Sequence, residues 1–440
     1  MSDEGPKIST GRLGRLARLA SMGARLSTDV VSRGVKRLRN ADADDLSALG
    51  PAAAEKLVAT LGELKGLAMK MGQQMSMDPD LLTPEVRAVI SRLQNQAPPM
   101  PYAQVQQVIF EQLKAAPHEV FASFDEKPMA SASLGQVHRA VTKAGLAVAV
   151  KIQYPDIAKA LESDLNNMSS MVTVLGAATR VGHAKSYFNE FKDSLTDELD
   201  YRAEAQRADV FRTACTALPL LVVPQVEHSL TAEKVLTMEL LSGPTLKEFL
   251  NNKTAATPND ELLRVSKLLI HAIWGTFLLS GVIHADPHPG NFILLADGRM
   301  GILDFGAIKK LSARFHDVAQ FMFRQTADDQ PLDCMKLSYD CGFEFEDPAA
   351  AKPIVEGVID LALLSARSRD FDYGTSSMNR DMKLLFMKNA TRMTGIRPPK
   401  ESVQFYRALG GLSNNLANVG ARGNFHGLYA ELADMVPVRT

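Results

Sequence analysis

The feature that most constrains this chain is a polar loop between two short apolar runs, IHADPHPGNFIL, followed by GILDFGAI. Asn291 stands five residues after Asp286, and Asp304 opens the DFG triplet. An isolated DFG carries little information, because Asp and Gly are common at turns. An Asp, an Asn five residues later and a DFG on the next strand are together hard to obtain by chance. We therefore interpret these residues as one site.

Kinase-like enzymes use this arrangement for two roles. A carboxylate takes or orients the proton of the acceptor, while the Asn and the DFG Asp hold magnesium ions that bridge the phosphates. We expect Asp286 to fill the first role, and Asn291 and Asp304 to bind Mg²⁺ with ATP or ADP, since magnesium prefers oxygen ligands. His284 is expected to support the backbone of the loop, and His288 to lie behind the ligating residues.

Upstream, the strand VAVKI contains Lys151 and matches the VAIK signature, whose lysine contacts nucleotide phosphates and pairs with a helix glutamate. A lysine at the end of a strand is otherwise a solvated residue, and the downstream loop favours the phosphate role. Apolar residues would then enclose the adenine. The backbone around Glu239 to Leu241 would supply the hinge hydrogen bonds to it. The predicted nucleotide contacts are Val137, Ala149, Lys151, Glu239, Leu241 and Ile293.

The glycine-rich loop expected before such a strand is replaced by PMASASLGQV, in which Gly135 is the single glycine. Backbone amides would then be presented to phosphates by an alanine and serine turn. This turn comprises Ala130, Ser131, Ala132 and Ser133. No APE triplet follows DFGAIKKL, so the segment that docks peptide substrates is missing. Both departures disfavour ordinary protein phosphorylation.

The order of local signals predicts an α+β fold with two lobes. A helix is predicted at Tyr102 to Leu113, after a proline cluster, and two short strands bracket a turn at Lys143 to Gly145. Long helices are expected at Pro155 to Arg180 and Ser186 to Thr213, then a strand at Lys234 to Leu240. The remainder reads as helical apart from residues 282–303. We place a basic segment at 1–45, a helical extension at 46–116, a sheet lobe with an inserted helix at 117–241 and a helical lobe at 242–440.

Residues 1–40 carry nine basic and three acidic side chains, a local charge of +6, with apolar residues at three- and four-residue steps. Such a helix either lies on anionic lipid or docks on the protein's own surface with solvated arginines.

Composition excludes several other classes of protein. The net charge of −1 gives no reason to expect nucleic acid as a partner, and the three cysteines lack metal-ligand spacing. The longest apolar run, Leu268 to Ile283, falls short of the roughly 18 to 20 residues that span a bilayer, so we predict a buried helix and no transmembrane helix. The start of the chain resembles neither a secretory signal nor a transit peptide. We expect a cytoplasmic protein, peripheral at most at the inner face of the membrane.

The chain resembles the UbiB/AarF family of atypical kinase-like proteins linked to ubiquinone biosynthesis. The resemblance covers roughly residues 45–400 and is carried by KMGQ at Lys70 to Gln73, the alanine-rich loop, ELD at Glu198 to Asp200, HADPHPGN and DFG. It implies that a helical extension with Lys70 and Gln73 folds over the nucleotide cleft, facing Glu198 and Asp200. It also implies that Glu204 pairs with Lys151, on another face of a helix that it shares with Glu198.

The same resemblance implies ATP binding and slow ATP hydrolysis, stimulated by lipid or phenolic quinone precursors, in support of other quinone-biosynthesis enzymes at a membrane. Two alternatives stay open. Small-molecule phosphotransferases of the aminoglycoside and choline kinase type share the HxDxHxxN loop but lack the KxGQ and ELD motifs. A nucleotide-binding scaffold without turnover would lack a catalytic residue, whereas Asp286, Asn291, Asp304 and Lys151 are all present.

Overall fold

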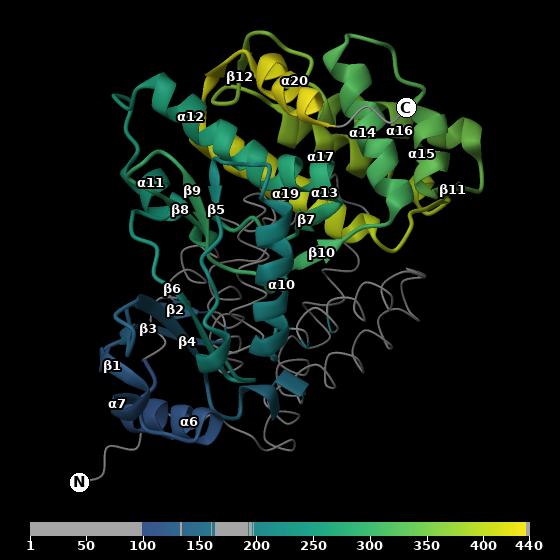
Figure 1. The fold of residues 1–440 in the computed structure, drawn as a ribbon. Helices are drawn as coiled ribbons and strands as arrows, with labels where there is room; N and C mark the ends of the chain where they lie inside the picture. Colours follow the sequence, from purple (N-terminus) through teal and green to yellow (C-terminus); the bar gives the residue numbers. More distant parts are fainter. Residues whose placement is uncertain are drawn as a thin grey trace, which may run out of the picture. The chain divides into compact units, whose positions relative to one another are not determined.

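In the computed structural model, the residues that are described are 99–132, 134–159, 161–162, 192, 196 and 198–436. They form two units (Figure 1). The first contains the described residues up to Ala205 and the segment Val226–Leu240, and the second contains Gln206–Gln225 and everything from Leu241 onward. The predicted segments 1–45 and 46–98, and most of the helix predicted from Pro155 to Arg180, lie outside the described residues.

The first unit is built on an antiparallel sheet with the order β1-β3-β4-β6, with β2 paired to β3. The strands are β1 (Phe121–Phe124), β2 (Ala130–Ala132), β3 (Gly135–Thr142), β4 (Ala147–Gln153) and β6 (Val235–Glu239). The turn between β3 and β4 contains Gly145 at a φ of 85°, a left-handed conformation that glycine adopts at little cost. The predicted small antiparallel sheet and its turn are confirmed.

Helix α6 (Tyr102–Leu113) has the bounds expected from the sequence, and it begins directly after Pro101. Its apolar residues recur at helical spacing, and Val105, Val108 and Ile109 are buried. They pack in one core with Val148, Val150 and Ile152 of β4, which point to one face of the sheet. Each such side chain contributes roughly 1.5 to 3 kcal/mol through its burial. The short helix α7 (Pro117–Val120) leads into β1, and the 3₁₀ turn η2 (His228–Leu230) precedes β6.

The second unit is mainly helical, as predicted. Its helices are α11 (Leu246–Asn252), α12 (Asn259–Ile270), α13 (Thr276–Ser280), α14 (Ala313–Ala327), α15 (Cys334–Cys341), α16 (Pro348–Ala362), α17 (Met378–Lys388), α18 (Ala390–Met393), α19 (Ser402–Val419) and α20 (Phe425–Met435). Helix α10 (Tyr201–Ala214) carries the chain from the first unit into the second.

Short strands interrupt the helices of the second unit. Strand β5 (Leu221–Val222) runs parallel to β9 (Met300–Ile302), which pairs with β8 (Phe292–Leu294), while β7 (Val282–His284) pairs with β10 (Ile308–Lys310). Two further pairs were not predicted. They are β11 (Glu344–Phe345) with β13 (Ile396–Arg397), and β12 (Phe371–Asp372) with β14 (Arg422–Gly423).

Most of the apolar run predicted as a buried helix belongs to a longer helix, and its last residues, Val282 and Ile283, lie in β7. A π-helical segment, η3 (His271–Gly275), joins α12 to α13, so the continuous helix Asn259–Ser280 has 22 residues and a mean hydropathy of 1.5 in its most apolar window. By length and composition it could cross a membrane, so the expectation that this helix is too short to do so was wrong. Since 72% of that window is buried, we interpret it as a core helix, which passes the same test.

Candidate active site

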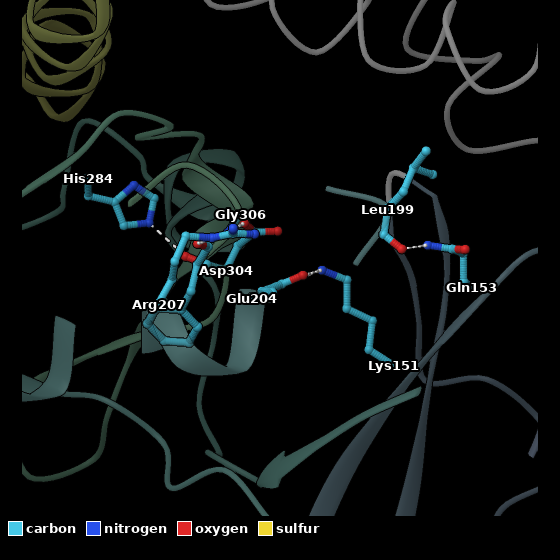
Figure 2. Close-up of polar contacts among 9 residues, drawn as sticks. Lys151, Gln153, Leu199, Glu204, Arg207, His284, Asp304 and Gly306 are labelled. Atoms are coloured by element: carbon cyan, nitrogen blue, oxygen red, sulfur yellow. Dashed lines mark hydrogen bonds and ion pairs between the residues drawn. The ribbon is translucent and has the colours of Figure 1, made fainter. Parts of the chain in front are cut away.

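Lys151 and Glu204 form an ion pair in the first unit (Figure 2). The Lys151 Nζ donates to both carboxylate oxygens of Glu204, at 2.8 and 2.9 Å, and lies 4.8 Å from the centroid of the Tyr201 ring. The side chain of Glu204 is 1% exposed and that of Lys151 10%. A buried charge is costly without a partner, so the pair fixes the position of both groups. The contact that the resemblance implied is present.

Lys151 points away from the packed face of the sheet. Side chains alternate along a strand, so Val150 and Ile152 lie in the core with α6 while Ala149 and Lys151 lie on the other face. Val137 of β3 is directly opposite Lys151, which places it on the same face. Val137 and Ala149 are half-buried there. Three of the predicted nucleotide contacts therefore share one face of one sheet.

The alanine-rich segment differs from the prediction. Ala130, Ser131 and Ala132 form strand β2 rather than a turn, because each is paired with β3, and Ser133 lies outside the described residues. Gly135 has a packing role: a Cβ there would lie 2.0 Å from the Ile152 carbonyl oxygen. Only glycine lets β3 approach β4 so closely at this point.

The ELD segment precedes helix α10. Asp200 accepts hydrogen bonds through Oδ1 from the backbone N–H groups of Arg202 (2.9 Å) and Ala203 (3.4 Å), so it caps the N-terminus of the helix. Glu198 is buried and lies in the turn before the helix. The expectation that Glu198 and Glu204 occupy one helix was wrong, because the cap starts the helix at Tyr201. Leu199 accepts a 3.0 Å hydrogen bond from Gln153 of β4 (Figure 2).

In the second unit, His284 connects the polar loop to the DFG triplet (Figure 2). Its Nδ1 accepts from the Asp286 N–H at 3.2 Å, so its Nε2 carries the proton and donates to the Asp304 carbonyl at 2.8 Å. Burial lowers the pKa of His284, which favours this neutral form. The edge of Phe211 packs against its ring. These contacts give His284 the backbone-supporting position that was expected.

The loop after β7 is held by its own side chains. His288 caps the 3₁₀ turn η4 (Pro289–Asn291) by accepting from the Gly290 N–H. The Asn291 Nδ2 donates to the Asp286 carbonyl at 3.0 Å, and the Asn291 carbonyl accepts from the Leu303 N–H at 2.9 Å. Asp304 accepts from the Gly306 N–H at 2.9 Å. Asn291 is thus bonded directly to Asp286, while His284 links the Asp286 N–H to the Asp304 carbonyl.

The oxygen atoms that this loop offers as ligands suit a magnesium ion. Because the amide nitrogen of Asn291 is engaged with Asp286, its oxygen is left as an acceptor, and Asp304 supplies a carboxylate. Among the described residues there is no cluster of three or more His, Cys, Asp or Glu side chains that could enclose an ion. A magnesium ion held here would complete its shell with phosphate and water oxygens, as magnesium commonly does in phosphoryl-transfer enzymes.

Helix α19 contributes two residues that sequence reasoning missed. Arg407 places its Nη2 3.8 Å from Oδ1 of Asp286, and its Nε and Nη2 are buried. The Asn415 Nδ2 donates to the Pro287 carbonyl at 2.6 Å. Both residues are more than a hundred positions from the loop in sequence, and no motif marks them.

The other residues that the sequence predicted for the site do not share one element. Glu239 ends strand β6, Leu241 begins the second of the two chain segments that form the second unit, and Ile293 lies in β8. The side chains of Leu241 and Ile293 both lie over Gly301, where a Cβ would come within 2.5 Å of each. Lys70 and Gln73 lie outside the described residues. The nucleotide, metal and catalytic roles assigned from the sequence stay predictions.

The segment after the DFG triplet is short. Strand β10 begins at Ile308 and helix α14 at Ala313, with Ser312 as its N-cap. A long peptide-docking loop of the protein-kinase type has no room between these elements.

Comparisons with known proteins agree with this picture. Among curated relatives, "Atypical kinase COQ8B, mitochondrial" of Danio rerio is 30% identical over 416 residues, 92% of this chain and 66% of that protein. "Atypical kinase coq-8, mitochondrial" of Caenorhabditis elegans is 28% identical, over 97% of this chain and 58% of that protein. The chain thus spans less than two thirds of the length of both relatives.

A solved structure is also similar. The complex of Rv3197 with erythromycin from Mycobacterium tuberculosis is 30% identical, with a TM-score of 0.60, over 89% of this chain and 98% of that one. The predicted α+β kinase-like fold is confirmed, while the extension expected over the cleft lies outside the described residues. The sequence model of the ABC1 atypical kinase-like domain matches residues 92–337, more than half of the chain. This chain therefore belongs to the ABC1 atypical kinase-like family.

Proposed function

We propose that this protein binds magnesium ATP and either hydrolyses it slowly or transfers its γ-phosphoryl group to a small molecule, in support of isoprenoid quinone biosynthesis at a membrane surface. The observation that supports this most is the polar loop of the second unit, in which His284 and Asn291 hydrogen-bond to the backbone of Asp304 and Asp286. In such loops, kinase-like enzymes hold the residues that bind the metal and the carboxylate that takes or orients the proton of the phosphoryl acceptor.

In this proposal each residue has a defined task. Lys151, oriented by Glu204, holds the nucleotide phosphates, and the oxygens of Asn291 and Asp304 hold magnesium. Bound magnesium neutralises charge on the phosphates. Asp286 accepts or orients the proton of the attacking water or hydroxyl group. The guanidinium of Arg407, with its Nη2 3.8 Å from Oδ1 of Asp286, helps to hold this carboxylate in place.

The link to quinone biosynthesis depends on the family resemblance, with its KxGQ, alanine-rich and ELD motifs. The proposed partners are quinone precursors, anionic lipid and other quinone-biosynthesis enzymes. The basic segment 1–40 is the proposed lipid contact. Deleting it should lower binding to anionic liposomes, and equal binding by the truncated protein would assign the segment a purely structural role.

The test is phosphate release from magnesium ATP by the purified full chain, with and without liposomes and a phenolic quinone precursor. We expect turnover that these additions stimulate and that Asp286→Asn abolishes. Asp304→Asn should abolish magnesium-dependent nucleotide binding, and unchanged affinity would refute the metal assignment. Tight nucleotide binding without phosphate release under any condition would favour a scaffold that binds nucleotide without turnover.

A small-molecule phosphotransferase is the second candidate. The solved structure of Rv3197 is described as a complex with erythromycin, a small molecule, and it resembles this chain over most of its length. Phosphorylated product detected by mass spectrometry after incubation with candidate hydroxyl compounds, and absent with Asp286→Asn, would favour this activity over simple ATP hydrolysis.

A further inference from the structure

The second unit contains a cavity that the proposed chemistry does not use. It has a volume of about 220 Å³ and lies between α16, α17, α19 and α20, next to Trp274 of the π-helical segment. Figure 1 shows these helices in the green and yellow part of the chain. Its walls include Val358, Leu361, Met382 and Leu416. No charged residue lines it, so a phosphate or carboxylate group would lose its hydration there without gaining a partner.

The polar groups in the cavity wall are few and mostly satisfied by one another. The Tyr373 hydroxyl donates to Ser365 at 2.8 Å, and the Ser413 hydroxyl donates to the Asn379 Oδ1 at 2.6 Å. Since its oxygen is engaged with Ser413, Asn379 retains its Nδ2 group as a hydrogen-bond donor at the wall. Apolar walls with a few polar groups are typical of sites for small ligands, and Asn379 can donate to an oxygen of a neutral one.

The cavity can be reached from solvent. Tyr406 and Phe386 belong to its lining, yet they are 45% and 36% exposed. Large apolar side chains in such positions lose contact with water when a ligand enters. Met378 and Met382, also in the lining, are flexible enough to adapt to ligands of different shape.

We propose that this cavity is a binding site for a neutral, mostly apolar small molecule that carries one oxygen, which accepts a hydrogen bond from Asn379. The site is separate from the Asp286 loop. Asp286 and the two α19 residues that approach its loop, Arg407 and Asn415, are not among the residues that line the cavity. The inference stands independently of the proposed nucleotide chemistry.

The chain provides its own probe for this site. Trp274 is the single tryptophan in the sequence, and it lines the cavity. Titrating 1-octanol into the full chain should therefore produce a saturable change in tryptophan emission. Octanoate, which has the same chain length but a negative charge at neutral pH, should produce none. A saturable response to both compounds, or to neither, would overturn the proposal.

Gly410 offers a matched pair of variants. It lines the cavity, and a Cβ built there meets no atom within 4 Å. Gly410→Phe should fill the space and weaken octanol binding by about tenfold or more, while Gly410→Ala should bind as the parent does. Equal binding by a folded Gly410→Phe variant would contradict the site.

Asn379→Leu is a second variant that tests the hydrogen bond and does not depend on Gly410→Phe folding. It should weaken octanol binding by about threefold to tenfold, the value of one neutral hydrogen bond. Unchanged octanol affinity in this variant would overturn the role given to Asn379.

Discussion

The side chain of Asn415 in α19 donates a 2.6 Å hydrogen bond to the backbone carbonyl of Pro287, the residue that follows Asp286. Both residues are buried, so loss of the donor would leave the carbonyl without this partner. We expect Asn415→Leu to lower the free energy of unfolding by about 1 to 3 kcal/mol and to reduce phosphate release. Urea unfolding and turnover measure the two effects. Asn418→Leu, an exposed position on the same helix, is the control, and equal losses in both variants would contradict this role.

This contact also shows where sequence reasoning stops. The loop residues Asp286, Asn291 and Asp304 could be recognised because their spacing is local and the hydrogen bonds among them are short-range in sequence. Asn415 and Arg407 lie on an ordinary amphipathic helix, and only the tertiary fold brings them to the loop. Propensity and spacing hold no information about such a contact.

The same distinction, between features with a local sequence signal and features made by the tertiary fold, applies to the secondary structure. Strands β3 and β4 and helix α6 were predictable, because alternation, a turn glycine and a preceding proline are strong local signals. The pairs β11–β13 and β12–β14 have two residues per strand, too few to show any alternation. The helix predicted at Ser186 to Thr213 is interrupted at residues 198–200, where Asp200 caps the start of α10, and this capping role was overlooked.

The effects of Lys151 and Glu204 on the free energy of unfolding should depend strongly on each other. Removing one partner leaves a buried charge, so Lys151→Met and Glu204→Leu should each lower the free energy of unfolding by about 3 to 5 kcal/mol. The double variant should lose less than the sum of the two, because neither charge remains buried. Urea unfolding of all four proteins gives the coupling energy. Additive losses would show that the two groups do not depend on each other.

Gly135 should be intolerant of any side chain. A Cβ at this position would lie 2.0 Å from the Ile152 carbonyl oxygen, and backbone cannot yield as a flexible side chain can. Gly135→Ala should therefore lower the Tm and weaken nucleotide binding, since Lys151 precedes Ile152 in the same strand. Gly410→Ala, where the added Cβ meets nothing, should raise stability by up to about 1 kcal/mol through helix propensity. A Tm for Gly135→Ala equal to that of the parent would refute the close approach of β3 to β4.

His271 should make the stability of the protein depend on pH. Both ring nitrogens are buried without a hydrogen-bond partner among the described residues, and burial, aided by Lys267, lowers the pKa from 6.5 to about 4. In the unfolded chain His271 binds a proton near pH 6.5, whereas in the fold it stays neutral until about pH 4. The contribution of the neutral His271 ring to the free energy of unfolding is therefore complete above pH 6.5. It declines as the pH falls toward 4, by at most about 3 kcal/mol.

Replacing His271 by methionine removes this proton-binding group while retaining apolar volume. The variant should gain stability relative to the parent at about pH 5, and this gain should shrink at about pH 8, where neither state of the parent holds the extra proton. Urea unfolding at the two pH values measures the difference. His118→Met, at an exposed histidine, should show no such pH-dependent gain. An equal effect of His271→Met at both pH values would mean that the ring is not kept neutral by the fold.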